Sequence, residues 1–429
     1  MGWFVQTRRV AAALILLIII DLQVYSQDTA YVKRVVEILT SDSLAGRGYQ
    51  HNGDRKAAAF IASEFRKAGL ESIGSCYHQG VIFPVNNITG EVVCRIGDRT
   101  LKAGTEVLVS ARSKGVSREY RLVWLSHKTA KNPARLRRFF WRDLRNSLVV
   151  ADPAIAADKD LKELYQALFR GQISGVAGMV RIMDKPYWHI SDSGIETDYL
   201  VVTVKSGILD HRSRKMYVSF TNHFEPAYHS QNVAAMVRGT LHPDSFIVFT
   251  AHYDHLGRMG DVMFPGANDN GSGTAMVLDL ARHYSHNPHP YSVAFIAFTG
   301  EEAGLLGSTQ YTERPLFPLQ NIAVLFNFDM VASGSDGITV VNGSVHPGDF
   351  NLLDSLNAAH SLLKQVAVRG ESPNSDHHPF HARGVKAFFI YTMGSEQTEY
   401  HTINDRSPVP FTAYIPFFSL ITRYAELYH

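Results

Sequence analysis

The sequence predicts an α/β fold in which helices flank a mostly parallel central sheet, with a smaller β-rich domain inserted. Three observations lead to this fold class. From Ser245 onward, apolar runs of strand length alternate with segments of helical periodicity, as in parallel sheets with crossover helices. From about Phe83 to Thr221 the chain has short β-like runs separated by turns. The 429 residues exceed one usual compact core, so two domains are expected.

The N-terminus has the pattern of an export signal. Arg8 and Arg9 precede an apolar run over residues 10–20, and the small Ser26 stands where a cleavage site requires one. The apolar run is far shorter than the roughly 20 residues of a membrane-spanning helix. We therefore predict a signal peptide over residues 1–26, export to the periplasm or outside the cell, and no stable membrane anchor after cleavage.

The mature chain is predicted to form one larger domain in two parts. Residues 27–84 form its first part, with helices over Tyr31–Leu39 and Asp54–Ala68, whose apolar residues recur at helical spacing. Residues 85–222 form the insert, and residues 223–429 form the rest of the larger domain. Strands are expected in the insert at Glu91–Ile96, Tyr120–Leu125, Ser147–Ala151 and Tyr199–Val204.

The last part of the chain has the pattern of a doubly covered sheet. The expected strands are Phe246–Ala251, Ser292–Thr299, Ile322–Phe328 and Val385–Tyr391. The expected helices are Gly273–His286, Gly304–Thr312 and Phe350–Gln365. Ligands bind beyond the carboxyl ends of such strands, and the acidic and histidine motifs of this chain stand just past those ends.

Composition excludes some classes of partner. A net charge of +2 with 19% charged residues favours neither a disordered chain nor an obligatory polyanionic partner, so no nucleic acid is expected. Cys76 and Cys94 could form one disulfide or remain free. They lie too far from the acidic motifs to be metal ligands. The sequence leaves the oligomeric state open.

Two motifs near the first of these strands offer metal ligands. His252 ends that strand, and Asp254 two residues later can hold the second ring nitrogen of a ligating imidazole. Asp269 stands in the glycine-rich turn Gly266–Gly273, which lacks the Lys-Ser or Lys-Thr ending of a phosphate-binding loop. A carboxylate there suits a cation, and its two oxygens can bridge two metals.

The later motifs complete a site with oxygen and nitrogen donors. Glu301 and Glu302 are adjacent in a turn, so one can ligate a metal while the other acts as a general base. Asp329 follows another strand, and Tyr400 precedes His401 near the C-terminus. Together these residues predict a site for two zinc ions, since divalent cations offset the repulsion among gathered carboxylates.

The ordered motifs resemble those of the secreted dizinc aminopeptidase family, whose relatives include glutamate carboxypeptidase, glutaminyl cyclase and the transferrin receptor. The resemblance covers about residues 230–407, and the opening segment Leu39–Leu70, which contains Leu44–Gly48, resembles the start of that family's catalytic domain. The insert weakly resembles a protease-associated domain in three segments: residues 148–152, 159–169 and 175–180.

The resemblance implies a role for each motif residue. His252, Asp269 and Asp329 are expected to hold one zinc ion, and Asp269, Glu302 and His401 the other. Glu301 is the expected general base, Tyr400 stabilises the oxyanion, and Asp254 orients His252. Asp376 and His377 lie in a further family segment at the substrate pocket or behind the ligands. The family also implies a cis peptide bond between Asp269 and Asn270.

The predicted function is zinc-dependent removal of N-terminal residues from peptides, through a water shared by two zinc ions per chain. The alternatives are a carboxypeptidase or a glutaminyl cyclase-like enzyme of the same fold, or a non-catalytic peptide-binding relative. A serine hydrolase is disfavoured, because no Gly-x-Ser-x-Gly turn follows a strand. Any preferred N-terminal residue depends on loops that the sequence does not place.

Overall fold

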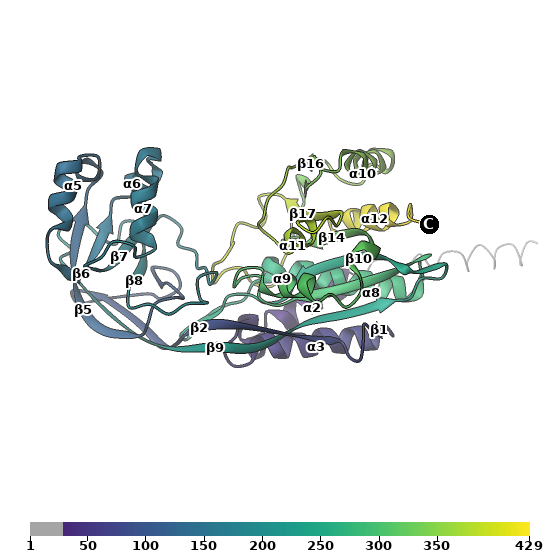
Figure 1. The fold of residues 1–429 in the computed structure, drawn as a ribbon, viewed down its shortest axis with the longest axis horizontal. Coiled ribbons are helices and arrows are strands. Elements are labelled where there is room, and N and C mark those ends of the chain that lie inside the picture. Colours follow the sequence, from purple (N-terminus) through teal and green to yellow (C-terminus); the bar gives the residue numbers. More distant parts are fainter. Residues whose placement is uncertain (1–28) are drawn as a thin grey trace, which may run out of the picture.

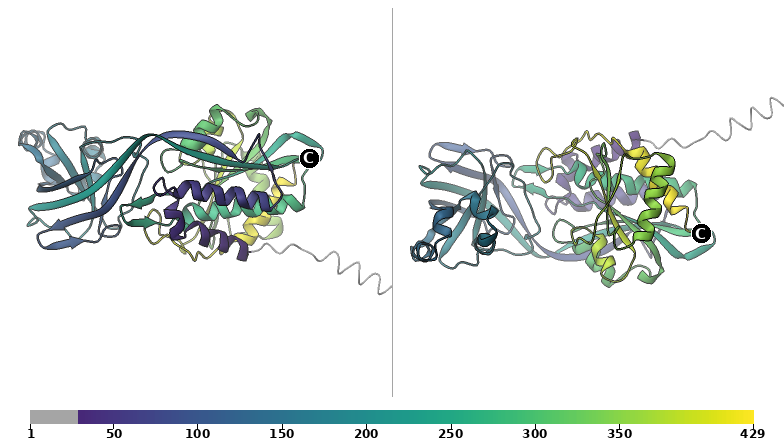
Figure 2. Two further views of the ribbon diagram at one scale, coloured as in Figure 1. Left: turned by 90° about the horizontal axis from the view of Figure 1, so that it is seen from below. Right: turned by 90° about the horizontal axis from the view of Figure 1, so that it is seen from above.

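The computed structural model describes residues 29–429. The predicted signal peptide lies outside the described residues and stays a prediction. The described chain forms a larger and a smaller lobe, joined by the long strands β2 (His78–Ile96) and β9 (Lys215–Val237) (Figure 1). These strands pair antiparallel along most of their length, and Figure 2 shows them running from one lobe to the other. Both predicted limits of the insert, residues 85 and 222, lie inside these strands.

The sheet of the larger lobe confirms the predicted fold class. Its central strands are β17 (Ala387–Met393), β14 (Ile322–Phe328), β10 (His242–His252) and β13 (Tyr291–Phe298), and all neighbours among them are parallel. Antiparallel strands flank them, namely β9 beside β13 and β15 (Gly337–Val341) beside β17. The short strand β16 (Val366–Val368) pairs in parallel with β15 at the edge.

The surroundings of strand β10 explain why the expected strand Phe246–Ala251 is almost entirely apolar. Ile247 and Phe249 belong to the hydrophobic core on one face of the sheet, whereas Phe246 and Val248 belong to the core on the other. Alternate side chains of a strand point to opposite faces, so a strand covered on both sides is apolar throughout.

Two groups of helices cover the sheet of the larger lobe. The first core includes residues of α2 (Thr29–Leu39), α3 (Gly53–Lys67), α8 (Gly273–His286) and α12 (Tyr414–Ala425). The second core includes Tyr311 of α9 (Leu306–Glu313) and Phe380 of α11 (His377–His381). Among residues 29–429, no helix has the length and hydrophobicity needed to cross a membrane.

The smaller lobe is built from parallel strands and helices. Strands β5 (Val116–Leu125), β6 (Leu144–Ala151), β7 (Val176–Met183) and β8 (Leu200–Lys205) pair in parallel in chain order, and β4 (Val107–Val109) adds antiparallel to β8. Helices α4 (His127–Ala130), α5 (Pro133–Phe140), α6 (Pro153–Ala157) and α7 (Lys162–Phe169) lie in the connections. The sequence also predicts a helix around Lys159–Phe169, which α7 confirms, whereas α4 and α6 were not among the expected elements.

Two other expectations are decided by the fold. Cys76 and Cys94 are both free; Cys76 is exposed, and burial raises the pKa of Cys94 to about 12. The helix expected over Phe350–Gln365 is instead α10 (Pro347–His360), so that prediction was wrong at both ends. Pro347 suits a first helical turn, and Ser361 ends the helix with a left-handed φ of 50°.

Candidate metal centre

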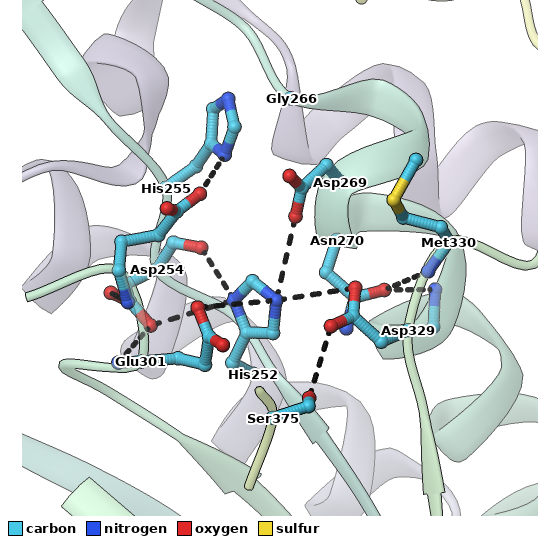
Figure 3. A network of polar contacts seen from close by, with 12 residues as sticks. His252, Asp254, His255, Gly266, Asp269, Asn270, Glu301, Asp329, Met330 and Ser375 are labelled. Atoms are coloured by element: carbon cyan, nitrogen blue, oxygen red, sulfur yellow. Dashed lines mark hydrogen bonds and ion pairs between the residues drawn. The ribbon is translucent and has the colours of Figure 1, made fainter. Parts of the chain in front are cut away.

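The five predicted ligands meet at the carboxyl ends of the parallel strands. His252 ends β10, Asp329 follows β14, and Glu302 lies in the turn after β13. Asp269 precedes α8, and His401 comes from the loop after β17. The His252 Nε2 atom lies 3.4 Å from Asp269 Oδ1 and 3.4 Å from Asp329 Oδ1 (Figure 3). The His401 Nε2 atom lies 3.1 Å from Asp269 Oδ2 and 3.2 Å from Glu302 Oε2. Asp269 thus faces both histidines, each with a different oxygen.

The buried atoms of this cluster suit cations. His252 Nε2 and Asp329 Oδ1 are buried, and their contacts with the described residues do not have the geometry of hydrogen bonds. Two groups could each hold an ion, one formed by His252, Glu301 and Asp329 and the other by His255, Asp269 and Glu302. Leaving buried polar atoms unpaired costs free energy. The donor set, imidazole nitrogens and carboxylate oxygens, is one that zinc accepts.

The second ring nitrogen of each expected histidine ligand faces a backbone carbonyl. His252 Nδ1 lies 3.2 Å from the Asp254 carbonyl oxygen, and His401 Nδ1 lies 2.7 Å from the Trp188 carbonyl oxygen. A carbonyl oxygen only accepts, so each Nδ1 carries the proton and each Nε2 is free to bind a cation. Trp188 belongs to the insert, which therefore orients one of the ligands.

Asp254 contacts His252 through its backbone carbonyl oxygen and uses its carboxylate mainly for other partners. Its carboxylate lies 3.7 Å from His252 Nδ1, farther than its own backbone carbonyl. The same carboxylate accepts hydrogen bonds from the Tyr49 hydroxyl at 2.7 Å and from the backbone N–H groups of Glu301 and Glu302 at 3.2 and 3.3 Å. Asp254 therefore also positions the turn that carries the two glutamates.

Two residues without a predicted role lie beside the ligands. His255 Nδ1 is 2.7 Å from Glu302 Oε1, and its side chain is fully buried. Ser375 donates a hydrogen bond of 3.0 Å to Asp329 and accepts one of 2.9 Å from Asn327. His255 follows Asp254 directly, so its position in the motif was a usable signal. Ser375 directly precedes Asp376, so its position beside a predicted site residue was a signal of the same kind.

The Asp269 turn has its own supports. The Asp405 carboxylate accepts hydrogen bonds from the backbone N–H groups of Asn268 and Asp269 at 2.8 and 3.0 Å. Gly266 has a φ of 63°, and a Cβ atom there would lie 2.2 Å from the Asp269 carbonyl oxygen, so only glycine fits. The peptide bond between Asp269 and Asn270 is cis, which confirms the expectation from the resemblance.

The carboxylates have pKa values shifted in opposite directions. Burial, with Glu302 and Asp329 nearby, raises the pKa of Glu301 well above its usual range, although His252 opposes the rise. Burial alone would also raise the pKa of Glu302, but His401 and His255 outweigh it and hold that pKa well below its usual range. Adjacent glutamates thus differ in basicity, and Glu301 retains a proton more readily than Glu302.

The two residues predicted behind the ligands are buried. Burial, reinforced by the charges of Asp254 and Asp329 and opposed by His252, raises the pKa of Asp376 to about 7. Burial lowers the pKa of His377 to about 3, and its ring centre lies 5.4 Å from that of Phe389. Asp376 is therefore electrostatically linked to the ligands, whereas His377 contacts a wall of the adjoining pocket.

A pocket of about 240 Å³ opens onto the cluster. Asp269, Glu301 and Asp329 line it on the side of the ligands. The other lining residues are Met330, Arg369, Asn374, Phe389, Tyr391, Tyr400 and His401. The Tyr400 ring stacks on the His401 ring with a centroid distance of 3.8 Å, and 43% of Tyr400 is exposed. The phenol is thus available to a group bound in the pocket.

Arg47 is fully buried behind the cluster, and we expect its removal to destabilise the fold. Its guanidinium donates hydrogen bonds to the carbonyl oxygens of Tyr253, Leu39, Pro265, Gly266 and Asp269. Burial lowers its pKa to about 10, so it stays charged at neutral pH. We expect Arg47→Met to lower the free energy of unfolding by about 3–5 kcal/mol, because several buried carbonyls lose their donor.

Urea titration followed by circular dichroism measures this loss. Arg212→Met, whose side chain is 95% exposed, is the matched control. Equal unfolding midpoints for the two variants would contradict the structural role of Arg47.

Known proteins match the larger lobe in sequence and the whole chain in fold. Residues 232–410 match Peptidase family M28. The aminopeptidase YwaD of Bacillus subtilis is 35% identical over 187 residues, which are 41% of this chain and 39% of YwaD. The probable lipoprotein aminopeptidase LpqL of Mycobacterium tuberculosis is 44% identical over 81 residues, which are 18% of this chain and 16% of LpqL.

Two solved structures share the fold. One is the zinc aminopeptidase BSAP of Bacillus subtilis, with a TM-score of 0.68 and 21% identity over 93% of this chain and 94% of that one. The other is a peptidase M28 precursor of Shewanella amazonensis, with a TM-score of 0.71 and 18% identity over 94% and 93%. Both alignments include the insert as well as the larger lobe, since each covers more than nine tenths of the chain.

Proposed function

We propose that this protein, whose residues 232–410 match Peptidase family M28, is a zinc-dependent aminopeptidase that releases residues from the free N-terminus of peptides. One observation carries the proposal: Asp269 presents one oxygen to His252 and the other to His401. A carboxylate shared in this way suits two adjacent cations. The family match and the aminopeptidase relatives support the reaction class.

We assign two zinc ions to the cluster. His252 and Asp329 complete one site with Asp269, and Glu302 and His401 complete the other. His401 is preferred to His255 for the second site because His401 Nε2 is within 3.2 Å of both carboxylates, whereas His255 has a short contact with Glu302 alone. When bound, two zinc ions lower the pKa of a water molecule and polarise the scissile carbonyl.

The residues of this chain would supply proton transfer and orientation. Glu301 lines the pocket beside the ligands Asp269 and Asp329, so its carboxylate can accept a proton from water and later pass it to the leaving amine. Tyr400, whose hydroxyl is available to the pocket, would donate to the oxyanion. Asp254 keeps Glu301 in place through the backbone N–H.

Peptides with a free N-terminus are the proposed substrates, and export through residues 1–26 is part of the same proposal. The pocket beside the cluster offers space for the first side chain of a peptide. Its walls combine apolar groups, such as Met330 and Phe389, with the cationic Arg369.

Chelation tests the proposed function. The purified protein is assayed on a panel of aminoacyl-anilides before chelation, after chelation, and after zinc is returned. We expect release of the free amino acid to stop on chelation and to recover with zinc. In the proposed reaction, the metal ions activate both the attacking water and the scissile carbonyl. Activity that persists without metal, or a protein that binds zinc but cleaves no anilide, would contradict the proposal.

A further inference from the structure

A second pocket, of about 260 Å³, lies in the insert. Strands β4, β7 and β8, the end of helix α7 and the connection between β7 and β8 contribute to its wall. The wall residues that matter here are Ser110, Phe169, Arg181, Tyr187, His189 and Asp192. The proposed reaction assigns no role to this pocket.

The wall formed by the connection is fixed to the metal centre. Trp188 and His401 exchange two hydrogen bonds: the Trp188 N–H donates to the His401 carbonyl oxygen at 3.1 Å, and His401 Nδ1 donates to the Trp188 carbonyl oxygen at 2.7 Å. Lys185 Nζ forms a 2.9 Å ion pair with Glu399 of the loop that carries His401. The His189 ring lines the pocket, and its centroid lies 4.6 Å from that of His401. The pocket and the metal centre therefore share one wall.

Arg181 gives the pocket an unused hydrogen-bond donor. Its guanidinium carbon lies 5.3 Å from the ring centroid of Phe169 and 5.9 Å from that of Tyr187. Its Nε atom is buried and has no hydrogen-bond partner among residues 29–429. Two ring contacts fix the position of this guanidinium, and its Nε atom still lacks an acceptor. Such a group can bind a planar anion with two parallel hydrogen bonds.

Two guanidinium groups, those of Arg112 and Arg181, lie near the single carboxylate of Asp192. Asp192, the carboxylate in the pocket wall, lies 3.5 Å from Arg112 Nε and accepts a 3.1 Å hydrogen bond from Ser110. Arg112 packs on Phe169 as Arg181 does, with its guanidinium carbon 5.3 Å from the ring centroid. Asp192 thus faces the charges of both Arg112 and Arg181, and one carboxylate between two guanidiniums leaves one positive charge for a ligand.

We propose that this pocket binds a carboxylate, and that the carboxylate is the C-terminus of a short peptide whose N-terminal end lies at the metal centre. The proposal rests on the proposed aminopeptidase function. Ring contacts of 4.6, 5.0 and 5.9 Å lead from His401 through His189 and Tyr187 to Arg181. An extended peptide advances about 3.3 Å per residue, so about four or five residues cover this path. The insert would then select short peptides by their length and their free C-terminus.

The test compares alanine peptides, from dipeptide to hexapeptide, as free acids and as C-terminal amides. We expect the free acid of the tetrapeptide or pentapeptide to exceed its amide by about 10-fold to 100-fold in kcat/KM, as expected for a charge-assisted pair. In Arg181→Met this acid-to-amide ratio falls close to one, while Arg181→Lys keeps part of it. The exposed control Arg212→Met keeps the wild-type ratio. The ratio is measured within each preparation, so a change in the folded fraction does not alter it.

Three results would overturn the proposal. Wild-type protein that cleaves anilides but treats acids and amides alike refutes the carboxylate pocket while leaving the aminopeptidase function intact. A protein that cleaves neither anilides nor peptides fails already at the proposed function. A third result would be that free succinate changes the anilide rate only when Arg181 is present, while acids and amides of peptides are cleaved equally well. The pocket would then bind a separate small acid and not the C-terminus of the peptide substrate.

Discussion

Replacing Glu301 by glutamine is expected to lower kcat on aminoacyl-anilides by about 100-fold to 10,000-fold, the range for loss of a general base. Glutamine keeps the size and the polar contacts of the side chain but cannot accept a proton. Glu301 faces the pocket together with Asp269 and Asp329, and its backbone N–H remains held by Asp254. KM is expected to change little, since the lost interaction belongs to the transition state.

Zinc content separates a loss of catalysis from a loss of metal. The Glu301→Gln protein is expected to keep the zinc content of the wild type, measured by plasma emission spectrometry on the dialysed protein. Glu313→Gln at the exposed end of α9 is the matched control and should keep full activity. A Glu301→Gln protein with near-normal kcat would remove Glu301 from the role of base.

Asp269→Ala is expected to abolish both metal binding and activity. Among residues 29–429, Asp269 is the one carboxylate with an ion-pair contact to both His252 and His401, so its loss removes a ligand from each proposed site. Zinc content should fall below about one ion per chain, because two adjacent cations need the bridging carboxylate. The lost metal assistance amounts to several kcal/mol, or about 1,000-fold or more in kcat.

Thermal unfolding with and without zinc gives a second readout for Asp269. In the wild type, excess zinc is expected to raise Tm, since a ligand that binds the folded state stabilises it. Asp269→Ala should lose most of this zinc-dependent rise, while the exposed control Asp354→Ala on α10 should keep it. If Asp269→Ala still gains the full rise with zinc, the ions are held elsewhere.

The strands and one helix that carry the site could be predicted from the sequence. The runs expected at Phe246–Ala251, Ser292–Thr299 and Ile322–Phe328 lie within or largely overlap β10, β13 and β14, and the helix Gly273–His286 coincides with α8. These strands are apolar throughout because both faces of the sheet are covered. In contrast, β15, β16 and α12 were not among the expected elements, although Phe417, Leu420, Ile421 and Tyr424 follow the helical period.

The sequence by itself determined which side chains stand past the strand ends: His252, Asp269, Glu301, Glu302 and Asp329. In a parallel sheet the strand ends lie at one edge, so order along the chain was enough to bring them together. Only the tertiary structure decided which groups hold these side chains in place. Arg47, Asp405, Ser375 and Trp188 reach the site from distant segments, as does His401 from its loop. Such contacts depend on how separate segments pack, which no local periodicity records.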